Sequence, residues 1–119
     1  MKELTKAEER IMQMLWKLEK AFTREILSEF KEEVPSYTTV ATVLGVLEQK
    51  GFVAHNVLGN SKQYYPLITK DKYSDFAMSN VLGKYFEGSL SQLVSFFAEK
   101  KKLDLKELNE IIEILESKK

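Results

Sequence analysis

The side chains best suited to chemistry in this sequence are small, polar and almost all uncharged, and they fall into two clusters. The first lies on a segment with helical spacing and consists of Ser36, Tyr37, Thr38, Thr39, Ala41, Thr42 and Gly45. The second follows a Gly-Asn turn and consists of Asn60, Ser61 and Lys62. Hydroxyl, amide and ammonium groups bind phosphate oxygens and base edges, so the two clusters predict contacts with DNA.

The same inventory offers little for catalysis or metal binding. His55 is the only histidine and the sequence has no cysteine, so no set of metal ligands is available, and we expect neither a metal nor a cofactor. We find no phosphate-binding glycine loop and no nucleophile with a paired base. We therefore predict that the chain is not an enzyme.

A helix over residues 36–50 is expected to carry the first cluster. Ser36 is a favourable N-cap, and Gly51 suits the position just after a helix end. The apolar stripe that repeats at helical spacing consists of Val40, Val43, Leu44 and Leu47. The threonines on the opposite face can contact phosphates or offer hydroxyl and methyl groups to base edges, and they can equally be solvent-facing residues.

The surrounding elements predict a winged helix-turn-helix. A helix begins at Thr5, a second covers residues 23–33, and Val34-Pro35 then interrupts the chain. After the helix at 36–50, strands at 52–58 and 63–68 flank a Gly-Asn turn, which tolerates the positive φ of a hairpin. In such a fold the helix lies in the major groove and the hairpin, or wing, lies on the backbone. The acidic residues Glu3, Glu8 and Glu9 are expected to form a solvated face.

The C-terminal part, residues 71–119, reads as a helical dimerisation region that follows a DNA-binding domain at residues 1–70. The predicted fold class is therefore mainly α with a small β-hairpin. Three amphipathic helices bury little apolar area alone, so they fold back on the winged domain or pair with a second copy. We favour pairing, because a two-fold dimer presents two DNA-reading heads. The expected dimer contacts are Phe76, Leu90, Leu93, Val94, Phe97, Leu108, Ile111, Ile112 and Leu115.

Charge neither requires nor forbids DNA binding. The 18 basic and 18 acidic residues cancel. Non-specific DNA binding usually needs an excess of positive charge, so binding here requires a local patch on a dimer. The neutral helix face also supports an alternative, a winged-helix protein-interaction module without sequence-specific DNA binding. No apolar run approaches the roughly 20 residues of a membrane span, so we expect a cytoplasmic protein without membrane insertion.

Several runs occur in a recognisable order and spacing. They are Leu4-Thr5-x-Ala7-Glu8-x-x-Ile11-Met12-x-x-Leu15-Trp16, then Thr39-Val40-x-Thr42-x-Leu44-x-x-Leu47-x-x-Lys50-Gly51, then Gln63-Tyr64-Tyr65-Pro66-Leu67, and a tail from Leu93-Val94 through Phe97-Ala98-Glu99-Lys100 to Leu115. Together they resemble the penicillinase-repressor family of winged-helix regulators over nearly the whole chain. The resemblance implies a homodimeric repressor on a palindromic operator in front of its own operon.

The resemblance also implies an induction mechanism, and here the sequence departs from the family. In antibiotic-responsive members a membrane sensor with a metalloprotease domain, encoded nearby, triggers cleavage at an Asn-Phe bond, and the aligned pair here is Phe96-Phe97. In copper-responsive members a cysteine cluster responds to the metal, and this chain has no cysteine. Where relatives often carry Arg or Lys in the recognition helix, this chain has Thr38, Ala41 and Val46. The resemblance therefore does not extend to the operator sequence, the regulated genes or the inducing signal.

Overall fold

The computed structural model describes residues 1–118 and divides the chain into two compact units. The first, Met1–Phe76, is called the winged unit below, and the second, from Ala77 onward, is called the helical unit. The elements of the winged unit are α1 (Lys6–Leu18), β1 (Ala21–Phe22), α2 (Thr23–Ser28), α3 (Tyr37–Gln49), β2 (Val53–Leu58), β3 (Ser61–Pro66) and the start of α4 (Lys70–Tyr85). This is the winged helix-turn-helix that the sequence predicts.

The core of the winged unit lies where the apolar faces of the three helices meet the sheet. Its fully buried large side chains are Met12, Leu15, Ile26, Leu44, Leu47, Val40 and Val53. Val40, Leu44 and Leu47 come from the predicted stripe of α3, which confirms the helix face assigned from the spacing. The opposite face of α3 is therefore left outside.

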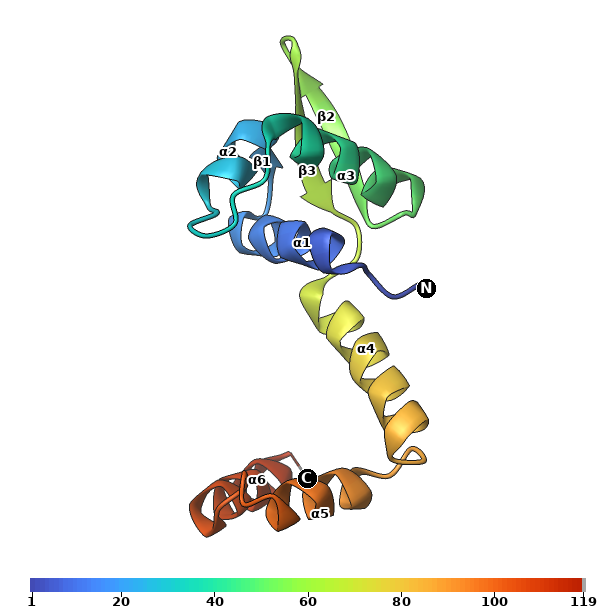
Figure 1. The fold of residues 1–119 in the computed structure, drawn as a ribbon, viewed down its shortest axis with the longest axis vertical. Helices are drawn as coiled ribbons and strands as arrows, with labels where there is room; N and C mark the ends of the chain where they lie inside the picture. The colour runs from blue at the N-terminus through green and yellow to red at the C-terminus, as the bar shows by residue number, and fades with distance from the viewer. Residues whose placement is uncertain (119) are drawn as a thin grey trace. The chain divides into compact units, whose positions relative to one another are not determined.

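The sheet has three antiparallel strands in the order β1-β3-β2. His55 pairs with Tyr64, and Val57 pairs with Lys62 near the turn, so these side chains share one face of the hairpin. The turn glycine, Gly59, has a φ of 63°, as the hairpin requires. The hairpin extends beyond α3 as a wing (Figure 1). The two-residue strand β1 was not predicted, since so short a segment carries no alternating pattern.

Helix α2 ends at Ser28, so the prediction that it continues to residue 33 was wrong. The chain leaves the helix so that Phe30 can bury its ring, and the Arg10 guanidinium lies 4.6 Å from the centre of that ring. The same guanidinium donates hydrogen bonds to the carbonyl oxygens of Glu32 and Glu33 at 2.9 and 3.1 Å. Arg10 thus fixes the loop that leads into α3.

Glu8 is the one member of the predicted acidic face that is buried, with 4% of its surface exposed, so that part of the prediction was wrong. Its carboxylate accepts hydrogen bonds from the Thr5 amide at 2.8 Å and from the Lys50 ammonium at 2.7 Å. Burial raises the pKa of Glu8, but the hydrogen bonds and charge of Lys50, together with those from Thr5, outweigh it and leave the pKa lowered. The ion pair joins the start of α1 to the end of α3.

The first residues of α4 belong to the winged unit. The Tyr73 hydroxyl accepts a hydrogen bond from the Leu4 amide at 2.8 Å, and its ring packs near Trp16, Phe52 and Phe76. The Trp16 indole donates to the Ile68 carbonyl at 2.8 Å. These contacts explain why the winged unit extends to Phe76, a few residues past the boundary at 70–71 that was expected from the sequence.

The helical unit contains the end of α4, then α5 (Leu90–Glu99) and α6 (Leu105–Ser117). Ser89 and Asp104 cap α5 and α6 by accepting hydrogen bonds from backbone amides. Phe86, Phe96 and Phe97 form a chain of edge-to-face ring contacts. None of residues 77–118 is buried. None of the helices described for residues 1–118 combines the length and apolarity of a membrane span.

Candidate DNA interface

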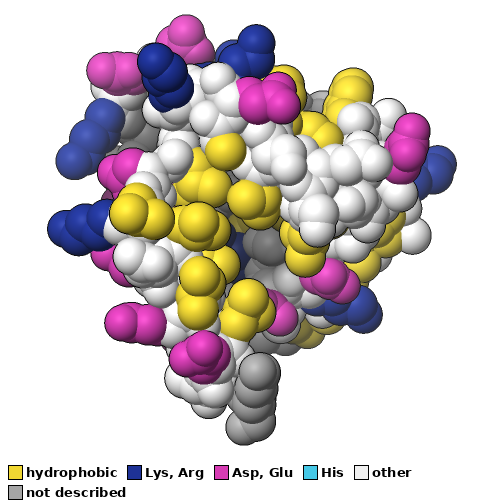
Figure 2. Space-filling view, turned by 90° about the horizontal axis from the view of Figure 1, so that it is seen from below, with side chains coloured by type: hydrophobic (Ala, Val, Ile, Leu, Met, Phe, Trp, Pro, Cys, Tyr) yellow, Lys and Arg dark blue, Asp and Glu magenta, His cyan; other side chains and the backbone are white. Residues whose placement is uncertain are grey.

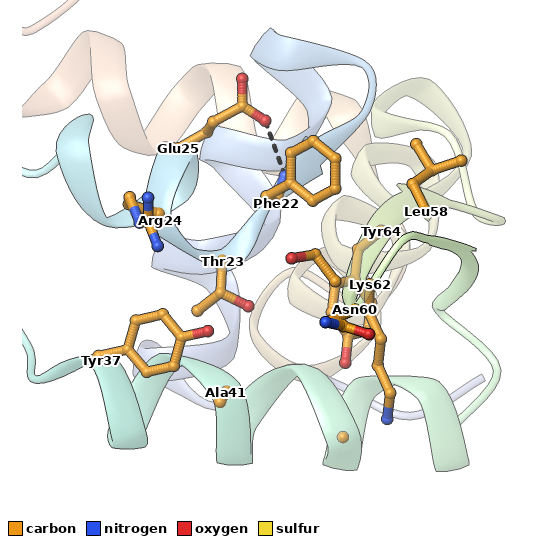
Figure 3. Close-up of a pocket in the computed structure, with 12 residues that line it drawn as sticks. Phe22, Thr23, Arg24, Glu25, Tyr37, Ala41, Leu58, Asn60, Lys62 and Tyr64 are labelled. Carbon is orange, nitrogen blue, oxygen red and sulfur yellow. Dashed lines mark hydrogen bonds between the residues drawn. The ribbon is translucent and has the colours of Figure 1, made fainter.

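A groove of about 590 Å³ lies between the start of α2, the outer side of α3 and the wing (Figure 3). Its lining residues are Phe22, Thr23, Arg24, Glu25, Tyr37, Ala41, Gly45, Leu58, Asn60, Ser61, Lys62 and Tyr64. In Figure 3 the Tyr37 ring points from α3 toward Thr23, and Asn60 and Lys62 reach from the wing toward α3. Helix and wing thus present their side chains to one concave surface.

The groove unites members of both clusters recognised in the sequence. Tyr37, Ala41 and Gly45 come from the helical cluster, and Asn60, Ser61 and Lys62 are the whole of the wing cluster. Thr38 and Thr42 are exposed on α3 but lie outside the groove lining. They remain on the outward face of the same helix.

Ser36 is the N-cap of α3, as the sequence predicts, and Thr39 takes part in the same cap. The Ser36 hydroxyl accepts a hydrogen bond from the Thr39 amide at 3.1 Å and donates to the Thr39 hydroxyl at 2.9 Å. Both side chains are exposed, but their hydrogen-bonding groups already serve the start of α3. Any contact they make with DNA therefore competes with the helix cap.

The sequence reasoning missed half of the lining, namely Phe22, Thr23, Arg24, Glu25, Leu58 and Tyr64, and Arg24 is the one of these six that carries a positive charge. It is exposed in the first turn of α2, and its guanidinium has no hydrogen-bond or ion-pair partner within residues 1–118. A positive charge in the first turn is no specific signal of an anion site, because Lys6, Lys70 and Lys106 also lie in the first turns of helices.

The groove is electrostatically suited to a phosphate backbone. Arg24 and Lys62 supply its two positive charges. Glu25, the acidic residue of the lining, accepts a hydrogen bond from the Phe22 amide at 2.8 Å and keeps its negative charge, so two positive charges face one negative charge in the groove. Glu48, the only charged residue of α3, lies outside the lining, 2.8 Å from the His55 ring nitrogen. Burial raises the pKa of the Tyr64 hydroxyl, and the nearby Glu48 and Tyr37 add to the effect. Tyr64 therefore stays neutral.

Two contacts hold the C-terminal half of α3 in place. Lys50, the residue after α3, binds Glu8 of α1, and Glu48 binds His55 of β2. The first contact fixes α3 against the core, and the second fixes it against the wing. None of these four side chains lines the groove, so both contacts support α3 without occupying the candidate DNA surface.

The residues predicted to form the dimer contacts make up a large apolar surface on α5 and α6. Leu90, Val94, Phe97, Ile111, Ile112 and Leu115 are exposed, and Leu93 and Leu108 are half-buried. Figure 2 shows hydrophobic side chains gathered in a continuous patch with charged side chains around it. Phe76, the remaining member of the prediction, is half-buried and packs on Tyr73 within the winged unit. Its part in a dimer remains a prediction.

Comparison with known proteins decides the family. The family model described as penicillinase repressor matches residues 4–117. The chain belongs to the penicillinase repressor family. It is 30% identical over 118 residues to the penicillinase repressor of Bacillus licheniformis, a match that covers 98% of this chain and 92% of the relative. It is 28% identical over 117 residues to the methicillin resistance regulatory protein MecI of Staphylococcus aureus, covering 98% and 95%.

The solved structures agree with the fold. The DNA-binding domain of the repressor BlaI matches with a TM-score of 0.53 at 31% identity, covering 61% of this chain and 94% of that chain. The family resemblance and the fold class expected from the sequence are thus confirmed. Members of the family are transcriptional repressors, which are not enzymes. The individual DNA and dimer contacts remain predictions.

Proposed function

We propose that this protein is a homodimeric transcriptional repressor that acts in the cytoplasm on a palindromic operator upstream of its own coding region. The observation that carries the proposal is that members of the two sequence clusters meet in one groove, whose cations Arg24 and Lys62 have no ion-pair partner among residues 1–118. Its membership of a repressor family, whose relatives include a DNA-binding domain of the same fold, supports this assignment over a protein-interaction module.

In this proposal the outward face of α3 enters the major groove and the wing lies on the backbone. Thr38 and Thr42 face the bases from α3. Arg24, Tyr37 and Lys62 border the path that a phosphate strand takes between the helix and the wing. Because Arg24 and Lys62 are the only two cations in the groove lining, we expect one winged unit alone to bind DNA weakly. Specific binding then depends on two units that bind the same duplex together.

In this proposal the helical unit provides the surface that binds the second copy of the chain. No residue from 77 to 118 is buried, although α5 and α6 carry many large apolar side chains. Monomeric proteins rarely leave such a continuous apolar surface in water. Pairing of α5 and α6 with those of a second copy covers it and places two winged units on one duplex, as a palindromic operator requires.

Induction then consists of any event that separates the two copies. The partner that the family resemblance implies is a membrane metalloprotease sensor encoded nearby. The aligned bond, Phe96-Phe97, lies inside α5, and the two rings are in edge-to-face contact at 5.6 Å. A protease must unwind this helix before it can reach the bond. Cleavage in this region would remove part of the apolar surface that holds the dimer.

The proposal is tested by fluorescence anisotropy with labelled DNA from just upstream of the coding region. Scrambled DNA of equal length is the control, and both are titrated at two salt concentrations. We expect a preference of about a hundredfold or more for the upstream DNA, with affinity that falls as salt rises. Equal and weak binding to both duplexes would refute the proposed autoregulation.

A further inference from the structure

The outward face of α3 is rich in methyl groups and poor in groups that fix the identity of a base. Thr38 and Thr42 are exposed, Ala41 is half-buried, and Val46 has 37% of its surface exposed. There is no Arg, Lys or Asn in α3, and its one Glu is bound to His55. The only side chain able to form two parallel hydrogen bonds with a base is Gln49, the last residue of the helix.

Each base in the major groove prefers a different kind of side chain. Guanine is read by Arg or Lys, adenine by Asn or Gln, cytosine by a free carboxylate, and thymine by apolar contact with its 5-methyl group. Threonine hydroxyls bind several bases and so add affinity more than selectivity. By elimination, the central part of this face, from Thr38 to Val46, complements thymine.

The spacing of the methyl-bearing residues fits every second base pair along a duplex. Thr38, Thr42 and Val46 follow each other at intervals of four residues on neighbouring turns of α3. At 1.5 Å per residue the interval is about 6 Å along the helix, close to two base-pair steps of about 3.4 Å. Beside them, a Cβ atom built on Gly45 would meet no heavy atom within 4 Å, so the surface there is open.

We propose that this protein selects its operator by contact with thymine 5-methyl groups, made by Thr42 and Val46 of α3. The proposal rests on the proposed function and adds the chemical class of the half-site, which must present thymine methyl groups to the centre of the helix. Val46 contributes two methyl groups and no hydrogen-bonding group. Thr42 contributes one methyl group beside its hydroxyl.

Deoxyuridine provides a direct probe, because it pairs as thymine does and lacks only the 5-methyl group. Upstream duplexes are synthesised with thymine replaced by deoxyuridine at all positions and then at single symmetric positions, and each is titrated by anisotropy. At about 0.8 kcal/mol per buried CH₂-sized group, each contacted methyl accounts for roughly fourfold in affinity. One contacted methyl in each half-site therefore gives about 16-fold, and scrambled DNA shows no such difference.

Two variants assign the effect to α3. Val46→Ala should bring the thymine-to-deoxyuridine affinity ratio toward one at the positions that Val46 contacts, with a smaller loss on the deoxyuridine duplex. Val34→Ala is the matched control, because Val34 is equally apolar and 56% exposed but lies in the loop before α3. It should keep the wild-type ratio. Circular dichroism confirms that both variants fold.

The outcomes separate the inference from the function on which it rests. Preference for upstream over scrambled DNA that survives complete replacement by deoxyuridine would overturn methyl reading and leave the repressor function standing. A wild-type ratio in both Val46→Ala and Thr42→Ala would overturn the assignment to these residues. Absence of any preference for the upstream DNA would overturn the proposed function, and methyl reading with it.

Discussion

Replacement of Gly45 by alanine should stabilise the free protein and weaken its complex with DNA. Gly45 lies in the interior of α3, and an added Cβ meets no heavy atom within 4 Å. Alanine is favoured over glycine in a helix interior by about 1 kcal/mol. For a domain of 60–100 residues this corresponds to a rise in Tm of roughly 4–8 °C. Nothing inside the winged unit opposes that gain.

The effect on DNA binding has the opposite sign, because Gly45 lines the groove between α3 and the wing. A methyl group forced into a close-packed interface typically costs about 1–3 kcal/mol. At 1.4 kcal/mol per factor of ten, this predicts a loss of roughly 5- to 150-fold in operator affinity for each half-site. Because stability and affinity move in opposite directions, unfolding cannot explain the loss.

Thermal unfolding and anisotropy on the upstream duplex measure the two effects. Gly83→Ala is the matched control, since Gly83 is also a helical glycine whose added Cβ meets nothing within 4 Å, but it lies in α4. We expect Gly83→Ala to leave operator affinity unchanged. If Gly45→Ala binds the operator as tightly as the wild type, the centre of α3 does not lie against DNA. If it lowers Tm, the open surface described for Gly45 is wrong.

Four further predictions concern the wing, the core ion pair and the dimer. Lys62→Ala should weaken binding to all duplexes alike and reduce the slope of log K against log salt by about one unit per wing, measured by salt titration. Lys50→Met leaves the buried Glu8 carboxylate without its cation and should cost about 1–3 kcal/mol in urea unfolding at pH 7, part of which Glu8→Gln should restore. The pKa of Glu8 is lowered in the folded state, so the ionised carboxylate contributes its full share to the free energy of unfolding above the ordinary pKa of 4.5. That share is lost as pH falls through the lowered pKa. Glu8→Gln should therefore make the free energy of unfolding depend less on pH on the acid side. Ile112→Lys should yield a monomer in light scattering with weaker operator binding, whereas Ile114→Lys, at an exposed position outside the predicted contacts, should remain a dimer.

Features set by neighbouring residues were predicted well from the sequence. The Ser36 cap and the Gly59 turn occur as expected, and of the predicted stripe of α3, Val40, Leu44 and Leu47 are buried and Val43 is half-buried. Each depends on hydrogen bonds or packing directions fixed within a few residues of the chain. The family resemblance rested on the order of such local features, and it was confirmed for the same reason.

Features set by distant residues were not predictable in the same way. Glu8 is buried with Lys50, 42 residues away, as its ion-pair partner, and the loop that follows the early end of α2 buries Phe30 and is bound by Arg10 of α1. Arg24 enters the site only because β3 brings the wing beside the start of α2, through pairing with β1. Helical spacing contains no information on any of these contacts. Four of the missed lining residues, Phe22, Thr23, Arg24 and Glu25, come from β1 and α2, and the other two, Leu58 and Tyr64, lie on the strands of the wing.

The most direct test of the central claim is a hydroxyl-radical footprint of the full-length protein on its own upstream DNA. Two winged units on a two-fold dimer should protect two backbone segments on one face of the duplex, about one helical turn apart and symmetric about the centre of a palindrome. Uniform cleavage, or a single protected segment at saturating protein, would contradict a dimeric repressor on a palindromic operator.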